Sequence, residues 1–352
     1  MTAPIDNTAA VRAGEELDIA ALETYLAQYV GAGKLSVEQF PSGHSNLTYL
    51  LRQGDRELVL RRPPFGSKVK SAHDMGREFK VLSKLNPVYA PAPKPLVYCE
   101  DESVIGAKFY VMERIKGVIL RGKRPKDLEI TPKIVTGCCT SLIENLASLH
   151  ALDYKAVGLD DLYKGSNYVE RQVNGWADRY TGSQTDEIAE IDQIVAWLKE
   201  RIPADTGAVL VHNDYKFDNI VLDPNDITKI IGVLDWEMAT IGDPLADLGT
   251  TLGYWIEPTD DAMNVVQSFI TTEPGALTRM QLAEIYAART GRDISNILFY
   301  YVLALMKLAV IVQQIYYRYK QGLTKDERFA PLIYMVAILG RKAVASVESG
   351  KI

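Results

Sequence analysis

The sequence contains few cysteines: Cys99, Cys138 and Cys139 are the three in 352 residues. Three cysteines cannot form a disulfide framework, and these are not spaced as a zinc-binding set, which excludes the small disulfide-rich and zinc-finger classes. A reducing, cytoplasmic setting fits this composition best, and we expect one. The first 15 residues carry acidic side chains and no apolar run, so they lack the pattern of a secretory signal.

The chain also lacks an excess of basic residues and a long apolar run. Its 39 basic and 45 acidic residues give a formal net charge of −6, which argues against a dedicated binder of nucleic acids or anionic membranes. The longest apolar stretch, Tyr301 to Tyr317, is short for a membrane span and is interrupted by Lys307, Gln313 and Gln314. We therefore expect a buried helix there, and neither a nucleic-acid nor a membrane partner.

The first third of the sequence predicts a helix followed by a small sheet. Apolar residues recur at helical spacing over Asp18 to Val30, and Leu35 to Leu60 then changes to short apolar runs separated by turn signals. A further helix is expected over Gly76 to Leu85 and a further strand over Lys108 to Arg114. We assign residues 1–34 to an N-terminal extension with a helix, and residues 35–116 to a small β-rich lobe.

The remainder of the sequence mainly predicts helices. A long helix is expected to begin at Pro132, because proline favours the first helical position. Short strand-like runs interrupt the helical pattern at Ala208 to His212, Ile220 to Leu222 and Ile230 to Leu234. We assign residues 117–352 to a large helical lobe and expect a hinge near Glu113 to Gly117.

Polar residues gather at the ends of these strand-like runs. His212 ends the first run and is followed by Asp214, Lys216 and Asn219, and Asp235 follows the last run. Asp214 and Asn219 are separated by four residues, the spacing of the protein-kinase catalytic loop, and Asp235 stands where such enzymes have a metal-binding aspartate. Each residue alone would be an ordinary turn residue, but their order and spacing together predict phosphoryl transfer.

The chemistry of phosphoryl transfer explains these residue types. Transfer from ATP depends on positioning and on neutralising charge at the phosphate oxygens, so we expect ATP and Mg²⁺ as cofactors. Asp235 and Asn219 would supply the oxygen ligands that Mg²⁺ prefers. Asp214 would accept the proton of the acceptor hydroxyl, and Lys216 would offset charge on the transferring group. His212 would order the loop or act in catalysis.

These motifs resemble those of the aminoglycoside phosphotransferase and choline kinase superfamily. The resemblance covers about residues 35 to 320 and is carried by His212-Asn213-Asp214 with Asn219, by Asp235-Trp236-Glu237 and by Asp243-Pro244-Leu245-Ala246-Asp247-Leu248-Gly249. Within that superfamily, the segment Val59-Leu60-Arg61-Arg62-Pro63-Pro64 is most similar to the kinase-like domain fused to some acyl-CoA dehydrogenases. The motifs are those of phosphotransfer and not of flavin chemistry.

The resemblance implies an α+β, protein-kinase-like two-lobed fold, with a small antiparallel-sheet N-lobe for the nucleotide and a large, mainly helical C-lobe. The C-lobe would carry the catalytic loop and the acceptor site. The resemblance also implies that Asp243 and Asp247 help to hold the catalytic loop, for which helix capping is the alternative.

The small lobe contains the predicted nucleotide-binding residues. Gly43, Ser45 and Asn46 lie where a phosphate-covering loop is expected, although a full G-x-G-x-x-G is absent. Arg61 stands in the place of the usual strand lysine, and Glu78 stands where the ion-pair partner of that lysine would be. Arginine keeps the charge but not the geometry of lysine, and an exposed ion pair of little consequence is the alternative.

Two further groups complete the predicted site. The backbone of Met112-Glu113-Arg114, at the connection between the lobes, would form hydrogen bonds with the adenine ring. Arg171, Trp176, Arg179 and Tyr180 form a polar-aromatic face on a predicted helix, which could bind an anionic or acyl-CoA-like acceptor. An amphipathic helix packed against its own domain would show the same pattern, and this is the alternative we favour.

We therefore predict a small-molecule kinase that transfers the γ-phosphoryl group of ATP to a hydroxyl, such as that of a hydroxyacyl-CoA or a hydroxy acid. One alternative is a catalytically weak, nucleotide-binding pseudokinase with a regulatory role, which Arg61 and the incomplete phosphate loop leave open. Another is an aminoglycoside kinase, although the sequence does not show the cluster of carboxylates typical of the pockets of such enzymes. The intact Asp214, Asn219 and Asp235 favour an active enzyme.

Overall fold

The computed structural model describes residues 8–41, 46–65, 74–122, 124, 128–260 and 269–352. The chain divides into two compact units, of which unit 1 comprises Met1–Ile119 and Asn219–Ala239, and unit 2 comprises Leu120–Asp218 and Thr240–Ile352. The lobe boundaries expected after residues 34 and 116 remain predictions. In that prediction each lobe is one continuous stretch of sequence, whereas unit 1 includes a segment from the second half of the chain.

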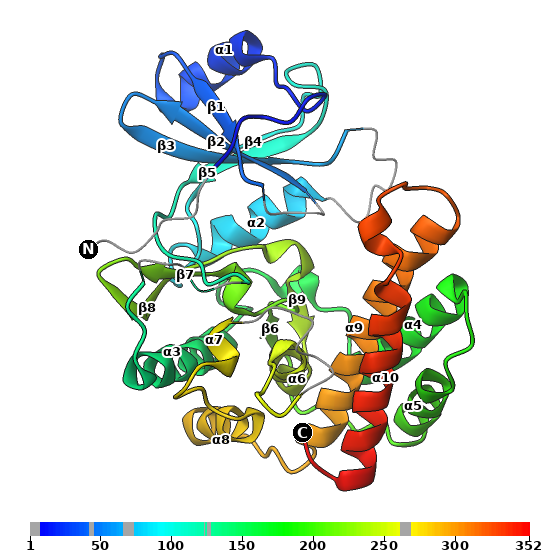
Figure 1. Cartoon of the computed structure of the whole chain (residues 1–352). Coiled ribbons are helices and arrows are strands. Elements are labelled where there is room, and N and C mark those ends of the chain that lie inside the picture. The colour runs from blue at the N-terminus through cyan, green and yellow to red at the C-terminus, as the bar shows by residue number, and fades with distance from the viewer. Residues whose placement is uncertain (1–7, 42–45, 66–73, 123, 125–127, 261–268) are drawn as a thin grey trace. The chain divides into compact units, whose positions relative to one another are not determined.

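Unit 1 is built on a five-stranded antiparallel sheet in the order β1-β2-β3-β5-β4 (Figure 1). Its strands are β1 (Ser36–Gln39), β2 (Leu47–Gln53), β3 (Arg56–Arg62), β4 (Pro95–Cys99) and β5 (Phe109–Glu113). Strands were expected in the regions of all of these except β4, which opens at Pro95 after two other prolines and resembles a loop in sequence. Because β4 lies at the edge of the sheet, Pro95 can be accommodated without an amide donor.

Two helices pack with this sheet, and an aspartate caps the N-terminus of each. Helix α1 (Ile19–Val30) is capped by Asp18, and α2 (Met75–Leu85) by Asp74. The apolar core of unit 1 includes Leu22 and Leu26 of α1 together with Leu58 and Leu60 of β3. Side chains alternate across a strand, so Arg61 faces the opposite side of the sheet from Leu60.

Unit 1 is completed by the hairpin of β7 (Ile220–Asp223) and β8 (Asp226–Val233). Val118 and Leu222 exchange backbone hydrogen bonds of 2.9 and 2.8 Å, which tie the hairpin to the chain that follows β5. A Cβ atom on Gly117 would lie 2.3 Å from the carbonyl oxygen of Leu222. Glycine is therefore required at residue 117 for this close approach.

The described part of unit 2 is mainly helical and contains one short two-stranded sheet (Figure 1). Its α-helices are α3 (Pro132–His150), α4 (Tyr168–Ser183), α5 (Ala189–Glu200), α6 (Pro244–Tyr254), α7 (Phe269–Thr272), α8 (Arg279–Thr290), α9 (Ile297–Lys320) and α10 (Leu332–Ser349). The sheet pairs β6 (Val209–Val211) with β9 (Thr240–Gly242). The 3-10 turns among the described residues of both units are η1 (Asp160–Leu162), η2 (Phe217–Asn219), η3 (Trp236–Met238) and η5 (Glu327–Phe329).

Helix α9 is the central helix of unit 2, and it packs against α4, α6 and α10. The buried helix expected over Tyr301 to Tyr317 is confirmed, because 72% of the most apolar window of α9 is buried. By length and composition alone, α9 and the stretch Glu327–Ser349 could each cross a membrane. The core helix of a soluble protein passes the same test, so these two helices are weak indicators of a membrane span.

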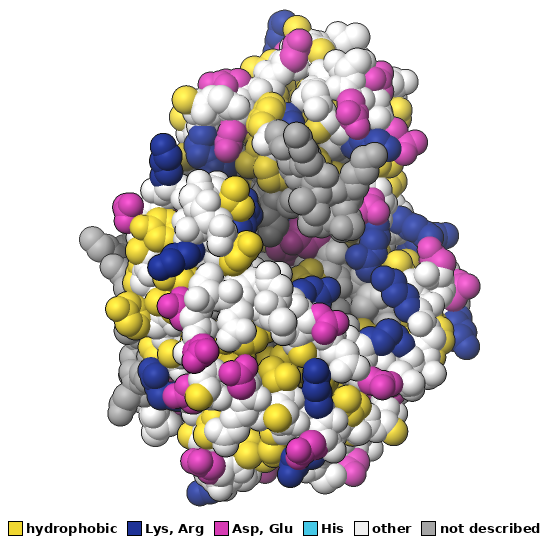
Figure 2. Space-filling view, turned by 90° about the vertical axis from the view of Figure 1, so that its right-hand side faces the viewer, with side chains coloured by type: hydrophobic (Ala, Val, Ile, Leu, Met, Phe, Trp, Pro, Cys, Tyr) yellow, Lys and Arg dark blue, Asp and Glu magenta, His cyan; other side chains and the backbone are white. Residues whose placement is uncertain are grey.

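The visible surface carries lysine and arginine side chains interspersed with aspartate and glutamate, and hydrophobic side chains lie between them (Figure 2). This mixture agrees with the modest net charge of the sequence.

Candidate active site

The two predicted metal ligands, Asn219 and Asp235, flank the open end of the β7–β8 hairpin in unit 1. Ile220 pairs with Val233 in the hairpin, and the amide of Leu234 donates to the carbonyl of Asn219 at 2.8 Å. The two ligands therefore leave the hairpin from neighbouring strand ends. Asp235 has a left-handed backbone with a φ of 68°, which is uncommon outside glycine and is best tolerated by Asn and Asp.

Arg61 is the centre of a buried ion network in the same unit. Its Nη1 lies 2.6 Å from Oε1 of Glu78, and its Nη2 lies 2.9 Å from Oδ1 of Asp235 and 3.7 Å from Oε2 of Glu237. Burial opposes the charge of Arg61, but the surrounding carboxylates raise its pKa well above its usual value. The expected pairing of Arg61 with Glu78 is thus present, and it is not the exposed pair of the alternative interpretation.

Glu237, which entered the sequence analysis only as part of a motif, links two other predicted elements to this network. Its Oε2 accepts a hydrogen bond of 2.6 Å from the Asn46 side chain, and its carbonyl accepts one of 3.3 Å from Arg77. Asn46 is thereby joined to the Asp235-Trp236-Glu237 segment. Gly43 and Ser45, the other residues of the expected phosphate loop, lie outside the described residues.

The residues at this end of the hairpin offer donor atoms of the types that bind a magnesium ion. Asp235 and Glu237 offer carboxylate oxygens, and Asn219 offers an amide oxygen, all of them hard ligands of the kind that Mg²⁺ prefers. Arg61 balances part of the negative charge that these carboxylates bring together. The cluster therefore has the donor types that the prediction requires.

The predicted adenine-binding segment lies at the end of β5. Met112 is buried within the sheet, and the amide of Glu113 donates to the carbonyl of Lys94 at 2.9 Å. The amide of Arg114 donates to the carbonyl of Glu57 at 3.3 Å. Because both amides already have acceptors, an adenine contact through this segment would use its carbonyl groups or the amides that follow it.

The predicted catalytic loop lies in unit 2, between β6 and the start of η2. Oδ1 of Asp214 accepts a hydrogen bond of 2.9 Å from Nζ of Lys216, which also lies 4.1 Å from the ring centre of Tyr254. His212 is fully buried, and its Nδ1 accepts the amide of Asp214 at 3.3 Å. This contact supports the interpretation that His212 orders the loop.

Two aspartates of α6 have different roles. Both oxygens of Asp247 accept loop amides, from His212 and Asn213, at 2.7 Å each. Burial raises the pKa of Asp247, but hydrogen bonds from a neighbouring histidine and from the loop amides hold it below its usual value. Asp243 instead caps α6 through the amide of Leu245 at 2.8 Å. The loop-holding and capping alternatives thus apply to Asp247 and Asp243 respectively.

Lys307 is a residue that the sequence analysis did not assign to the site. It lies in α9 with 6% of its surface exposed, and its Nζ donates to the carbonyl of Asn213 at 2.7 Å. The ammonium group also lies 5.9 Å from the ring centre of Trp176. The signal that could have identified it was a single cation in the middle of an apolar helix, where burying an unpaired charge would be costly.

The predicted acceptor face on α4 is divided in the structure. Trp176 and Tyr180 are buried, and the guanidinium carbon of Arg179 lies 4.6 Å from the ring centre of Trp176. Arg171 is exposed and donates to the carbonyls of Gly165, at 3.1 Å, and Ser166. The aromatic side chains of this helix are therefore buried, as the amphipathic alternative states. Arg171 instead donates hydrogen bonds to the loop that precedes the helix.

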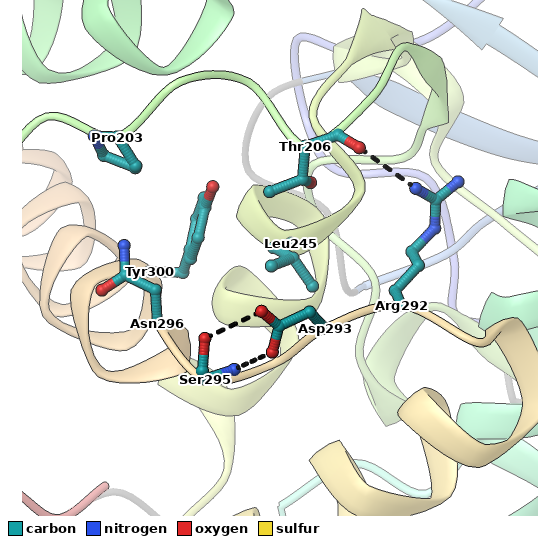
Figure 3. A pocket seen from close by; sticks show the side chains of 8 residues that line it. All are labelled: Pro203, Thr206, Leu245, Arg292, Asp293, Ser295, Asn296 and Tyr300. Carbon is teal, nitrogen blue, oxygen red and sulfur yellow. Dashed lines mark hydrogen bonds between the residues drawn. The ribbon is translucent and has the colours of Figure 1, made fainter.

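A separate pocket of about 230 Å³ lies in unit 2 (Figure 3). Its lining residues are Pro203, Thr206, Leu245, Arg292, Asp293, Ser295, Asn296 and Tyr300. Arg292 donates to the carbonyl of Thr206 at 3.4 Å, and Asp293 accepts the amide and hydroxyl of Ser295 (Figure 3). No predicted site residue lines this pocket, so we do not assign it to the acceptor.

Known proteins resemble this chain in sequence. A family described as "Phosphotransferase enzyme family" matches residues 36–280. Acyl-CoA dehydrogenase family member 11 of Rattus norvegicus is 39% identical over 333 residues, which make up 91% of this chain and 42% of the relative. The corresponding protein of Mus musculus is 37% identical over 330 residues, with the same coverage. The chain thus spans about two fifths of the length of these relatives.

Solved structures resemble the chain over nearly its whole length. A protein of Ralstonia eutropha, designated an aminoglycoside phosphotransferase, is 30% identical, with a TM-score of 0.78 over 94% of this chain and 99% of that chain. An aminoglycoside phosphotransferase in complex with ADP and hygromycin B is 15% identical, with a TM-score of 0.60 over 93% and 98%. The likeness to the latter shows the fold alone. The expected protein-kinase-like α+β fold and the expected superfamily are confirmed.

Proposed function

Because the chain belongs to the phosphotransferase enzyme family, we propose that it transfers the γ-phosphoryl group of ATP to a hydroxyl group of a small molecule. The observation that carries this proposal is the cluster of oxygen donors in unit 1, where Asp235 and Asn219 flank one hairpin end and Arg61 binds Asp235. A structural neighbour that was captured with ADP supports the choice of an adenine nucleotide.

The residues of unit 1 would bind the nucleotide and its metal. Asp235 and Asn219 would hold Mg²⁺, which when bound supplies neutralising charge at the phosphate oxygens. Arg61 carries a full positive charge and a planar donor group, which suits it to bind a phosphate oxygen. The network with Glu78 keeps this guanidinium in one place before the nucleotide arrives. Gly43, Ser45 and Asn46 would cover the phosphates.

The loop of unit 2 would carry out the proton transfer. Asp214 would accept the proton of the acceptor hydroxyl as that oxygen attacks the γ-phosphorus, while the bond from this phosphorus to the β–γ bridging oxygen breaks and ADP leaves. The ammonium group of Lys216, 2.9 Å from Oδ1 of Asp214, would offset charge on the transferring group. The His212 ring accepts the amide of Asp214, so its role would be to hold the base in position.

The acceptor would be a hydroxyacyl-CoA or a small hydroxy acid. The name of the curated relatives refers to acyl-CoA, which supports a substrate of that chemistry for the shared segment. Arg179, which lies against the ring of Trp176 on α4, is the predicted acceptor residue that this proposal retains, since Arg171 serves a loop and Trp176 and Tyr180 are buried. A cytoplasmic enzyme without a nucleic-acid or membrane partner completes the proposal.

One observation favours a second candidate, a nucleotide-binding module without transfer activity. Nη2 of Arg61 is bonded to Oδ1 of Asp235, so one oxygen of the predicted metal ligand already has a partner. If arginine retained this oxygen when the nucleotide bound, the metal would lose one ligand and turnover would be slow. The two candidates differ in turnover and agree in nucleotide binding.

A two-stage experiment separates the candidates. Thermal-shift titration with ATP, with and without Mg²⁺, tests binding, since a ligand of the native state raises the unfolding temperature. A screen for acceptor-dependent ADP release then tests transfer, starting with hydroxyacyl-CoAs and hydroxy acids and including aminoglycosides. Mg²⁺-dependent stabilisation with acceptor-dependent release supports the kinase. Stabilisation without release across the whole screen supports the binding module, and the absence of stabilisation contradicts both.

A further inference from the structure

We propose that Lys307 is a positioning residue, which fixes the peptide group between Asn213 and Asp214 and so orients the predicted catalytic carboxylate. This inference rests on the proposed function only in taking Asp214 as the group that meets the acceptor hydroxyl. The contacts that support it all lie within unit 2.

Asn213 has a backbone conformation that needs support. Its φ is 66°, in the left-handed region, which residues with a side chain adopt infrequently and at some cost. Three helices hold it there. Asp247 of α6 accepts its amide at 2.7 Å, Lys307 of α9 donates to its carbonyl at 2.7 Å, and the hydroxyl of Tyr168 at the start of α4 donates to its side-chain oxygen at 3.0 Å.

The bond from Lys307 bears most directly on Asp214. The carbonyl of Asn213 and the amide of Asp214 belong to one planar peptide group, so fixing both ends fixes the plane. Lys307 holds the oxygen end, and Nδ1 of His212 accepts the amide at the other end at 3.3 Å. The orientation of this plane, together with the φ of Asp214, sets the direction in which the Asp214 side chain leaves the backbone.

The burial of Lys307 indicates that its positive charge serves the hydrogen bond to the loop. An apolar side chain would pack at this position of α9 at lower cost, because a buried ammonium group loses its hydration. A charged donor forms a hydrogen bond about twice as strong as a neutral one. The bond to the Asn213 carbonyl is therefore of the strong kind while Lys307 keeps its proton.

The charges around Lys307 are mixed. The loop presents Asp214 and Lys216, α6 presents Asp247, and Arg179 of α4 lies against Trp176, the ring that Lys307 also approaches. Burial lowers the pKa of Lys307 to about 8, a shift that the carboxylates of Asp214 and Asp247 limit. The residue is thus protonated at neutral pH and loses its charge above about pH 8.

Amide hydrogen exchange tests the positioning role without any ligand. In Lys307→Met, we expect the amides of residues 211–216 to exchange about tenfold faster than in the wild type, the scale of one lost hydrogen bond to a charged group. Lys320→Met is the matched control, because Lys320 is an exposed lysine at the end of the same helix. It should exchange like the wild type. Wild-type exchange of the loop in Lys307→Met would overturn the inference.

A second measurement tests the consequence for the reaction, using ADP release from ATP and Mg²⁺ with water as the acceptor. Lys307→Met should lower kcat about tenfold without changing the KM for ATP. The wild-type rate should decline above about pH 8, and Lys307→Arg should retain its rate there, because arginine keeps its proton. An alkaline decline that is identical in all three proteins would overturn the inference.

The two measurements also separate this inference from the proposed function. A wild-type protein without acceptor-dependent ADP release across the screen would contradict the proposed function, yet faster loop exchange in Lys307→Met would still support the positioning of Asn213 by Lys307. If Lys307→Met speeds amide exchange throughout unit 2, hydrogen exchange in Lys307→Arg and in Tyr168→Phe gives the decisive comparison. The positioning role is supported if the loop amides exchange at the wild-type rate in Lys307→Arg and about threefold faster in Tyr168→Phe. The second effect is small because Tyr168 contributes a neutral hydrogen bond. Wild-type exchange in both would overturn the inference.

Discussion

The predicted site residues of unit 1 and those of unit 2 are held by different interactions. In unit 1, side-chain charges hold one another, with Arg61 bonded to Glu78 and Asp235. In unit 2, side chains hold the backbone, with Asp247 and Lys307 bonded to the amide and the carbonyl of Asn213. A charge network can exchange one partner for another when a ligand arrives, whereas a clamped peptide group keeps its geometry with or without a ligand.

This difference has a functional meaning. Side chains that can exchange partners suit a nucleotide and metal site, where arriving phosphates and Mg²⁺ bring their own charges. A clamped backbone suits a base, because proton transfer depends on fixed distances to the reacting group. We therefore expect substitutions in the unit 1 cluster to impair binding, and substitutions in the unit 2 loop to impair the chemical step.

The largest effect is expected from Asp235→Ala. No other carboxylate at the end of the hairpin is as well placed to hold the metal, so Mg²⁺-dependent ATP binding and turnover should both fall by about a thousandfold or more. Binding can be followed by titration calorimetry with and without Mg²⁺. Asp226→Ala, at the other end of β8, is the control and should bind normally. Wild-type Mg²⁺ dependence in Asp235→Ala would contradict the metal assignment.

Asp214→Asn should separate chemistry from binding most clearly. Asparagine nearly preserves the size of the side chain but cannot accept the proton, so kcat should fall by about two orders of magnitude or more. ATP affinity in the presence of Mg²⁺ should stay within about twofold of the wild type. Single-turnover transfer at saturating nucleotide and acceptor is the measurement. A mutant that retains the wild-type transfer rate would remove Asp214 from this role.

Arg61 tests whether the charge or the shape of the guanidinium matters. Arg61→Ala should weaken ATP binding about tenfold or more and leave Glu78 buried without its main partner. Arg61→Lys should retain part of the affinity, because the charge is kept and the planar fork is lost. Arg56→Ala, an exposed arginine on the same strand, is the control for thermal-shift titrations. Equal affinity in all of these proteins would place Arg61 outside the nucleotide site.

Gly117→Ala should loosen the hairpin that carries both predicted metal ligands. A Cβ atom at this position would lie 2.3 Å from the Leu222 carbonyl oxygen, so the backbone must shift. We expect a loss of about 1–3 kcal/mol in the free energy of unfolding, measured in urea. Gly54→Ala controls for the loss of a glycine, because no atom lies within 4 Å of its added Cβ, although its φ of 58° adds some strain. Equal losses in both would argue against the role of this contact.

The smallest expected effect is the pH dependence that Lys307 contributes to stability. The pKa of a lysine in an unfolded chain is about 10.4, and burial lowers the pKa of folded Lys307 to about 8. Between these values the unfolded chain binds more protons, so the free energy of unfolding rises with pH in this window. Urea midpoints of the wild type should therefore rise relative to those of Lys307→Met from about pH 8 to 10. A constant difference would show that Lys307 keeps its ordinary pKa.

Local sequence patterns predicted much of this arrangement. The spacing of Asp214, Asn219 and Asp235 depends on a short loop and one hairpin, and the pairing of Arg61 with Glu78 joins a strand to the next helix. Such features are encoded within about 20 residues. The short strand β9 escaped prediction because it has three residues and ends at Gly242, too little for a period of two to appear.

Contacts between distant segments could not be predicted in this way. Lys307 and Asn213 are separated by 94 positions, and nothing in the helical period of α9 indicates which carbonyl its one buried cation would meet. The same is true of Asp205, which accepts the first amides of α4 at 2.9 and 3.0 Å in place of a local cap. Periodicity shows which face of a helix is buried, but the partner depends on the packing of the whole unit.

The passage of the chain out of unit 2 at Asn219 and back at Thr240 affects how the protein can be made. On the ribosome, residue 119 emerges 100 residues before Asn219, a delay of about 5–20 seconds at ordinary rates of synthesis. During that time Val118 has no Leu222 to pair with, and Arg61 has Glu78 but no Asp235. The nascent chain must therefore present the first stretch of unit 2 before unit 1 can close. The folding of the two units is interleaved, and no single cut in the gene can separate them.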